Sequence, residues 1–368
     1  MTGRSQRKIS VSESCTAPRK ETDVIYVGRV PVGGGHPIAV QSMTKTKTAD
    51  VRATLRQIKA LETAGCEIIR LAVPDMDAAK CLSRIRKSIG IPMIADIHFD
   101  WRLALEAIEQ GVHGLRLNPG NIGTPWKIRE VVNAARDAGI SIRVGVNAGS
   151  LEKDLLRKYG HPSPMALVES ASRHVRLLED LNFTRVKVSL KASEVQKTVQ
   201  AYRLFSRQFR YPLHVGISEA GPPSTGIVKS SVGIGILLSE GIGDTIRVSL
   251  TAPPIEEVRV AYAILGSLGL RKRGVNIVSC PTCGRCTINL RALVRRVEKK
   301  IGNVQKPLTI AVMGCVVNGP GEAKEADIGI AGSKGRGILF KKGAIVERVA
   351  EDKLLDTLLE AVRSYPSS

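Results

Sequence analysis

The feature that most constrains the fold is a regular alternation of short apolar segments with longer segments of helical periodicity, running from residue 38 to residue 268. Strands are expected at residues 38–43, 67–73, 92–97, 113–117, 141–146, 185–190, 213–217 and 245–250. Helices are expected between them at residues 50–64, 76–89, 101–110, 125–138, 164–181, 193–209, 224–239 and 254–268. Such alternation predicts a parallel sheet, and eight repeats in about 230 residues fit a closed (β/α)8 TIM barrel. A doubly wound open sheet remains the alternative, because periodicity does not show closure.

The pattern changes after Leu270, where a basic linker at residues 271–274 precedes a group of cysteines. A basic helix near residues 287–301, a strand at 308–313, a glycine-rich stretch and a closing helix near 351–363 follow. We therefore predict an N-terminal tail (1–30), a barrel (31–270) and a small α+β domain (271–368). This last part has few elements for a core of its own, and a bound metal would supply stability that it otherwise lacks.

The charge and the terminal segment limit the classes of partner. The formal net charge of +21 attracts polyanions and acidic proteins. Aromatic residues make up 4%, which is few for stacking on bases, and we find no nucleic-acid-binding signature. The first twenty residues lack the apolar core of a signal peptide, and no apolar run reaches the length of a membrane span. We expect a cytoplasmic protein with neither a nucleic-acid nor a membrane partner.

Cationic side chains recur at the ends of the expected strands, where barrel enzymes place their chemistry. Five different strands contribute Arg70, Arg116, Arg143, Lys191 and Arg247. Guanidinium forks match phosphate oxygens and an ammonium adds a point charge, so a closed barrel predicts a polyanion site of about the size of a diphosphate. Polar candidates beside these cations are Asp96, His98, Asn118, Asn147 and Ser249.

The acid–base candidates at the same end of the barrel are Asp96, His98 and Glu219. His98 could equally be a structural residue or a residue that donates a hydrogen bond to a phosphate. Glu219 is the better proton donor, because a carboxyl group facing a partly closed site can have a raised pKa.

Four of the seven cysteines lie in the last quarter of the chain: Cys280, Cys283, Cys286 and Cys315. An intracellular protein keeps thiols reduced, which favours a metal site over disulfides. Four thiolates can hold structural zinc or an iron–sulfur cubane, and their spacing leaves both open. The Asn-Gly-Pro-Gly-Glu turn after Cys315 would bring Glu322 back toward the thiols. An added carboxylate favours a redox cluster with one exchangeable iron.

Ten motifs together resemble the 4-hydroxy-3-methylbut-2-enyl diphosphate synthase family of isoprenoid biosynthesis, in its two-domain bacterial form. They occupy residues 40–44, 70–75, 95–100, 116–123, 143–147, 191–193, 219–221, 247–250, 279–283 and 314–323. The resemblance thus extends over nearly the whole chain.

The resemblance implies an iron–sulfur oxidoreductase with one [4Fe–4S] cluster per chain, held by Cys280, Cys283, Cys315 and Glu322. It implies a cyclic diphosphate substrate, 2-C-methyl-D-erythritol 2,4-cyclodiphosphate. The substrate contacts that it implies are Arg70, Arg116, Arg143, Lys191, Arg247 and Ser249. It also implies Glu219 as the proton donor, flavodoxin or ferredoxin as the electron donor, and a head-to-tail homodimer whose site closes between subunits.

Two features depart from the family's pattern, and one alternative stays open. Cys286 is an additional cysteine, so this group offers one thiol more than the resemblance implies as ligands. In the loop after the first strand, Lys45 and Lys47 stand where the family often has asparagine and aspartate. We leave Lys45 and Lys47 out of the expected site. A zinc-ribbon nucleic-acid-binding protein on a barrel scaffold would use the same cysteines and charge, but it does not explain the cations at the strand ends.

Overall fold

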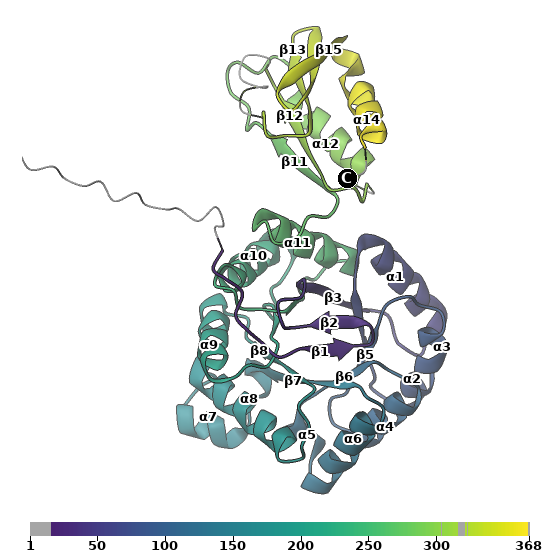
Figure 1. Ribbon diagram of the computed structural model, residues 1–368, viewed down its shortest axis with the longest axis vertical. Helices are drawn as coiled ribbons and strands as arrows, with labels where there is room; N and C mark the ends of the chain where they lie inside the picture. Colours follow the sequence, from purple (N-terminus) through teal and green to yellow (C-terminus); the bar gives the residue numbers. More distant parts are fainter. Residues whose placement is uncertain (1–15, 303, 316–320, 322, 367–368) are drawn as a thin grey trace, which may run out of the picture. The chain divides into compact units, whose positions relative to one another are not determined.

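The computed structural model describes residues 16–302, 304–315, 321 and 323–366. The chain divides into two compact units, Met1–Arg271 and Lys272–Ser368. Figure 1 shows helices around strands in the first unit and a small sheet with two helices in the second. None of the described helices combines the length and the apolarity that a bilayer span requires.

The first unit contains a ring of eight parallel strands. These are β3 (Ala39–Met43), β4 (Ile68–Ala72), β5 (Met93–Asp96), β6 (Gly114–Leu117), β7 (Ser141–Asn147), β8 (Val186–Lys191), β9 (His214–Val215) and β10 (Thr245–Ile246). They are hydrogen-bonded in the order β8-β7-β6-β5-β4-β3-β10-β9. A parallel bridge between Val188 and Leu213 joins the two ends of this order. The expected (β/α)8 barrel is therefore confirmed, and the open-sheet alternative is wrong.

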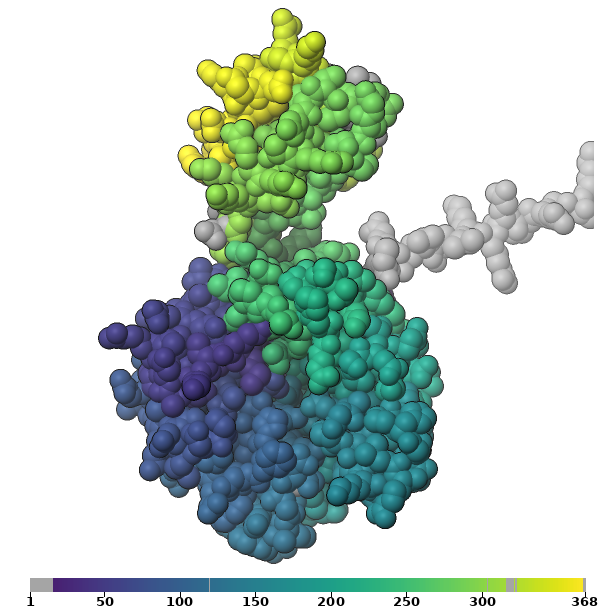
Figure 2. Space-filling model, turned by 180° about the vertical axis from the view of Figure 1, so that it is seen from behind, coloured from purple at the N-terminus to yellow at the C-terminus, as the bar shows by residue number. Residues whose placement is uncertain are grey.

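Helices cover the outside of this ring. They are α1 (Val51–Ala64), α2 (Met76–Lys80), α3 (Leu82–Arg86), α4 (Trp101–Glu109), α6 (Pro125–Asp137), α8 (Pro164–Glu179), α9 (Val195–Gln208), α10 (Pro223–Ser239) and α11 (Pro254–Ser267). Each buries an apolar stripe, as α1 does with Ile58 and Leu61. In the space-filling view this helical layer forms a closely packed surface (Figure 2). The expected helix at 76–89 is two short helices, and α5 (Pro119–Ile122) and α7 (Lys153–Tyr159) were not expected.

A short hairpin covers one end of the barrel. β1 (Ile25–Val27) pairs with β2 (Val30–Val32), and its apolar residues pack on Ala39, Ile68 and Ile94 near the amino ends of β3, β4 and β5. The expected tail to residue 30 therefore already contains ordered structure; strands of three residues are too short for a sequence pattern to show. The hairpin leaves the carboxyl ends of the strands as the open end.

In its described residues, the second unit contains a five-stranded sheet and the helices α12 and α14. The strands β11 (Val275–Ser279), β12 (Leu308–Met313), β13 (Ile328–Ser333), β14 (Arg336–Lys341) and β15 (Ala344–Ala350) are neighbours in chain order. The first three are parallel and the last two add antiparallel hairpins. The helices α12 (Leu290–Ile301) and α14 (Leu354–Ser364) contribute to one apolar core with the sheet.

The glycine-rich stretch expected after β12 contains the antiparallel strands β13 and β14. A Cβ on Gly329 would lie 2.2 Å from the ring of Phe340, and one on Gly337 would lie 2.5 Å from Leu354. These glycines allow close packing within strands rather than marking turns.

Candidate active site at the barrel mouth and the cysteine loop

The barrel brings the expected cations together on its inner face. Paired positions on neighbouring strands align Asp96 with Arg116, Arg116 with Arg143, and Arg143 with Lys187. Arg116, Arg143 and Lys191 are buried, although each ends in a cationic group. Burial lowers the pKa of all three, and neighbouring cations lower it further, although Asp96 partly opposes this lowering for Arg116 and Arg143. Concentrated and desolvated positive charge of this kind is stabilised by a bound polyanion.

Asp96 is the carboxylate at the centre of this group. Its oxygens lie 3.7 Å from Arg70 Nε, 3.4 Å from Arg116 Nη1 and 3.5 Å from His98 Nε2. Burial alone would raise the pKa of Asp96, but Arg70, the His98 contact, Arg116 and Arg143 together lower it well below its usual range. Asp96 is therefore ionised at neutral pH, and it orients two of the guanidinium groups rather than supplying a proton.

Several buried donors in the barrel have no hydrogen-bond partner among the residues that the structure describes. On the inner face of the strands they include Arg116 Nε, Arg143 Nε and Nη1, Lys187 Nζ, His214 Nε2 and the side-chain amide of Gln41. Buried polar groups in folded proteins are nearly always paired, so an unpaired set in one place indicates that a ligand or water completes it. This set lies on the inner face of the strands that carry the cations.

Lys187 was not among the expected site residues, although a signal for it was present. Lys187, Ser189 and Lys191 alternate along β8 and are all buried, so they share the inner face of the barrel. Burial, followed by the charges of Arg143 and Arg70, lowers the pKa of Lys187 to about 7. Lys187 is therefore an amine that is only partly charged near neutral pH.

Two glycines give the cations their space. A Cβ on Gly145 would lie 2.7 Å from Arg116 Nε, and a Cβ on Gly216 would lie 2.8 Å from Lys191 Nζ. A side chain at Gly145 would displace the Arg116 guanidinium, whereas one at Gly216 would also lie 2.3 Å from the backbone carbonyl oxygen of Arg247. Both glycines are thus part of the site without contacting a ligand.

Three expected polar residues also lie at this end of the barrel. Asn118 is buried and caps α5 by accepting a hydrogen bond from Gly120 N. With its amide group rotated so that the oxygen faces Arg116, Asn147 accepts a hydrogen bond from Arg116 Nη2 at 3.2 Å. Ser249 lies beyond β10, two residues after Arg247, and is partly exposed.

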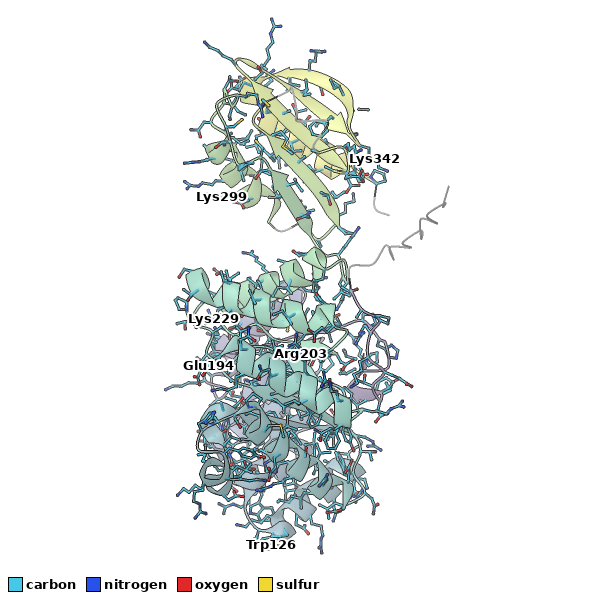
Figure 3. All side chains as sticks on the ribbon, turned by 90° about the vertical axis from the view of Figure 1, so that its left-hand side faces the viewer. Trp126, Glu194, Arg203, Lys229, Lys299 and Lys342 are labelled. Carbon is cyan, nitrogen blue, oxygen red and sulfur yellow. The ribbon has the colours of Figure 1, made fainter. Side chains whose placement is uncertain are left out.

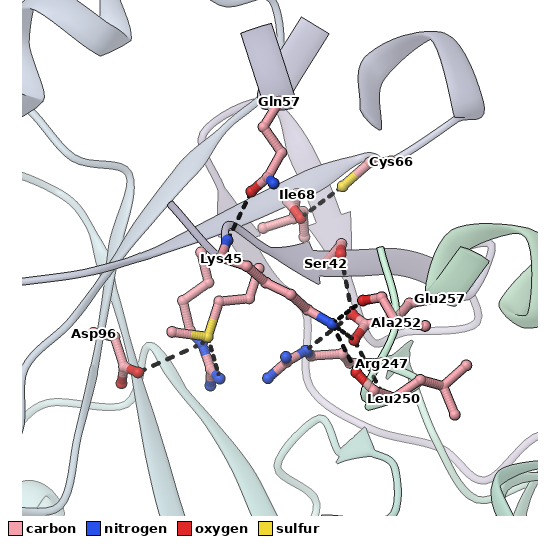
Figure 4. Close-up of polar contacts among 12 residues, drawn as sticks. Ser42, Lys45, Gln57, Cys66, Ile68, Asp96, Arg247, Leu250, Ala252 and Glu257 are labelled. Atoms are coloured by element: carbon pink, nitrogen blue, oxygen red, sulfur yellow. Dashed lines mark hydrogen bonds and ion pairs between the residues drawn. The ribbon is translucent and has the colours of Figure 1, made fainter. Parts of the chain in front are cut away.

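Glu257 is a second buried carboxylate that the sequence pattern did not reveal. Figure 4 shows Ser42, Lys45 and Arg247 around it. Lys45 Nζ lies 2.9 Å from Glu257 Oε1 and also donates to the carbonyl of Leu250 at 2.7 Å. Lys45 thus connects the loop after β3 with the segment after β10 and with α11, and its ammonium is already occupied.

Glu219 follows β9 and is exposed. Its φ of 53° lies in the left-handed region that residues other than glycine rarely adopt. Such strain costs about 1–3 kcal/mol and is found mainly at functional sites, where the surrounding structure holds it. The backbone at Glu219 is therefore held in a specific orientation, as a positioned acid requires.

The cysteine loop lies at the ends of two neighbouring strands. Cys280 directly follows β11, and Gly314-Cys315 follows β12, which pairs with β11 in parallel register. Gly314 N donates to Cys280 Sγ at 3.3 Å, and a Cβ on Gly314 would lie 2.5 Å from Cys286 Sγ. Cys280, Cys286 and the start of the Cys315 segment are therefore adjacent.

The cysteine thiols of this loop are suitable ligands for a thiolate-bound metal, although the described residues do not complete a metal site. Cys283 is exposed, and hydrogen bonding from the backbone of Arg285, together with its charge, lowers the pKa of the Cys283 thiol. Cys286 N donates to the carbonyl of Cys283 at 2.9 Å, which forms a tight turn. No three histidine, cysteine or acidic side chains within the described ranges are grouped closely enough to hold a metal ion. Glu322 lies outside the described residues.

Comparison with protein families decides the identity of both units. The GcpE TIM-barrel domain matches residues 22–262, and the GcpE protein C-terminal domain matches residues 276–364. The chain belongs to the GcpE family. The inference drawn from the ten motifs is thereby confirmed, and no comparison supports the zinc-ribbon alternative.

Individual GcpE relatives are similar over almost their full length. A protein of Thermodesulfovibrio yellowstonii is 62% identical over 94% of this chain and 99% of its own. One of Geobacter sulfurreducens is 59% identical over 94% of this chain and 98% of its own. Both are named 4-hydroxy-3-methylbut-2-en-1-yl diphosphate synthase (flavodoxin). The chain is accordingly an enzyme, an oxidoreductase of the same type.

Proposed function

We propose that the protein reduces 2-C-methyl-D-erythritol 2,4-cyclodiphosphate to (E)-4-hydroxy-3-methylbut-2-enyl diphosphate and water, with electrons from flavodoxin or ferredoxin. The observation that carries the proposal is the buried cation set of the barrel, in which Arg116 Nε, Arg143 Nε and Nη1 and Lys187 Nζ have no partner among the described residues, in a chain of the GcpE family. A cyclic diphosphate has the charge and size that this set requires.

The cations would contribute to the rate as well as to binding. Two electrons and one proton convert the cyclic dianion to a linear trianion, so ring opening adds one negative charge to the diphosphate. Arg116, Arg143 and Lys191 are fixed in the barrel before this charge develops, and preorganised charges stabilise such a change most effectively. Arg70, Arg247, Ser249, Asn118 and Asn147 would complete the contacts, with His98 beside them and Asp96 orienting Arg70 and Arg116.

Cys280, Cys283, Cys315 and Glu322 would hold a [4Fe–4S] cluster, which supplies electrons one at a time and a Lewis-acidic iron when bound. Soft thiolates at the ends of β11 and β12 suit iron. Cys286 instead donates its thiol to the carbonyl of Ile288 at 3.4 Å, as a structural cysteine can. Glu219 would deliver the proton.

A spectroscopic and chemical experiment tests the proposal. Anaerobically purified protein should be brown, contain about four irons and four sulfides per chain, and convert the cyclodiphosphate in the presence of reduced flavodoxin. A colourless preparation that binds stoichiometric zinc would overturn it.

We further propose that the enzyme is cytoplasmic and acts as a homodimer whose site is completed across subunits. The barrel mouth and the cysteine loop belong to different units of the chain. One substrate must meet residues from both units, within a chain or between two chains.

A further inference from the structure

α12 of the second unit presents a dense row of cations to solvent. The helix buries Leu290, Val297 and Ile301 against the sheet and α14. Its exposed residues include the cations Arg291, Arg295, Arg296, Lys299 and Lys300. Figure 3 shows Lys299 on the outside of the unit. Glu298 is the single carboxylate within the helix.

These five cations are not neutralised inside the unit. None has an ion-pair partner in the part of the chain that the structure describes. Arg291 and Arg295, Arg295 and Lys299, and Arg296 and Lys300 are spaced four residues apart, and like charges at this spacing destabilise a helix. Arg291 also lies in the first turn, where the helix dipole disfavours positive charge. Lys299 and Lys300 lie in the last turn, where the helix dipole favours positive charge, so the electrostatic cost comes from Arg291 and from the repulsion among the cations.

The cationic row lies next to the cysteine loop in the chain and in the fold. Three residues separate Cys286 from the first residue of α12, and the Asn289 side chain caps the helix by accepting from Ala292 N at 3.1 Å. Arg285, between Cys283 and Cys286, is exposed and extends the cationic surface to the thiols. A partner bound here would be close to any redox group that the thiols hold.

We propose that Arg285 and the exposed cations of α12 form the docking surface for the acidic redox protein that delivers electrons. This inference rests on the proposed function, because it takes the cysteine loop as the redox centre. Electron-transfer partners meet through small, wet interfaces that depend on complementary charge. The surface has no aromatic residue for stacking on bases, so an acidic protein fits it better than a nucleic acid.

The test is a triple charge reversal, Arg295→Glu, Arg296→Glu and Lys299→Glu, in the full-length cluster-loaded enzyme. The matched control is Arg52→Glu, Arg56→Glu and Lys59→Glu on α1, which changes the same number of exposed cations at helical spacing in the other unit. Turnover is measured with reduced flavodoxin over a range of salt concentrations, and separately with reduced methyl viologen. Binding of oxidised flavodoxin is measured by calorimetry.

We expect the α12 variant to lose about tenfold or more in kcat/KM for flavodoxin at low salt, and to lose most of the salt dependence. Its turnover with methyl viologen should stay within about twofold of wild type, and the α1 variant should behave like wild type with both donors. A triple change to glutamine should give an intermediate loss.

Wild-type-like flavodoxin kinetics in the α12 variant would overturn the inference, and so would an equal loss in the α1 variant. Loss of DNA binding by the α12 variant, with flavodoxin turnover unchanged, would assign the surface to nucleic acid instead. If wild type turns over with neither reduced flavodoxin nor reduced methyl viologen, the proposed function fails, and this result is distinct from a failure of docking alone.

Discussion

Lys187 gives the most direct test of the charge distribution inside the barrel. Its side chain is 1% exposed, its Nζ has no partner among the described residues, and its pKa is lowered from about 10.5 to about 7. The substitution Lys187→Met keeps an unbranched chain of similar length and removes the amine. The variant should therefore be more stable than wild type when no ligand is bound.

The size of the effect follows from the two pKa values. The unfolded chain keeps this lysine protonated up to about pH 10.5, whereas the folded barrel releases the proton near pH 7. Between these pH values the unfolded state binds more protons, so the free energy of unfolding of wild type rises with pH. The full difference is roughly 5 kcal/mol, and the part gained between pH 7 and 9 is about 2 kcal/mol. The advantage of Lys187→Met is therefore largest below pH 7 and declines above it.

The two tryptophans make this measurable in the intact protein. Trp101 begins α4 and Trp126 lies in the first turn of α6, so tryptophan fluorescence during urea unfolding reports on the barrel alone. Wild type, Lys187→Met and the exposed control Lys229→Met are compared at pH 7 and pH 9 without substrate. If the free energy of unfolding changes equally with pH in wild type and Lys187→Met, Lys187 does not titrate in this range and the argument is refuted.

Four further outcomes are expected. Arg143→Ala should weaken binding of the cyclodiphosphate by about 1.5–3 kcal/mol in calorimetry, yet stabilise the ligand-free barrel because a buried unpaired cation is removed; unchanged binding would contradict the assigned site. Gly145→Ala should weaken the same binding by displacing the Arg116 guanidinium, with cluster content unchanged, and a wild-type affinity would show that the space is not needed. Cys280→Ser, Cys283→Ser and Cys315→Ser should each lose iron by metal analysis, whereas Cys286→Ser should keep it; bleaching of Cys286→Ser would change the ligand set. Glu219→Gln should reduce turnover by roughly 100- to 10,000-fold with substrate affinity retained, whereas Glu322→Gln should alter the spectrum of the cluster. Mixed dimers of Glu219→Gln with Cys315→Ser should regain activity unless the site lies within one chain.

The barrel could be predicted because each of its strands and helices carries its own pattern. The expected strands at 213–217 and 245–250 nevertheless have regular pairing only at His214–Val215 and Thr245–Ile246. The chain becomes irregular where Gly216, Arg247 and Ser249 contribute to the mouth. Sequence patterns report the repeating part of a strand and not the point at which it departs from its neighbours.

The cations at the strand ends were also foreseeable, but their supporting residues were not. In the segment of β8, the apolar residues Val186, Val188 and Leu190 alternate with Lys187 and Lys191. An alternating pattern usually places its polar face in solvent, whereas a barrel places it inside. Glu257 lies on α11 and meets Lys45 only through the closure of the barrel, which no local pattern encodes.

The hairpin of β1 and β2 has a kinetic consequence. It covers the amino ends of the strands with apolar side chains, and the interior of such a barrel is packed with side chains, so a molecule bound at the mouth must leave by the side from which it came. The linear diphosphate formed there would still face the same cations and block the next cyclic molecule until it departs. Inhibition by product should therefore be competitive with substrate, and slow dissociation of the more highly charged product would limit kcat.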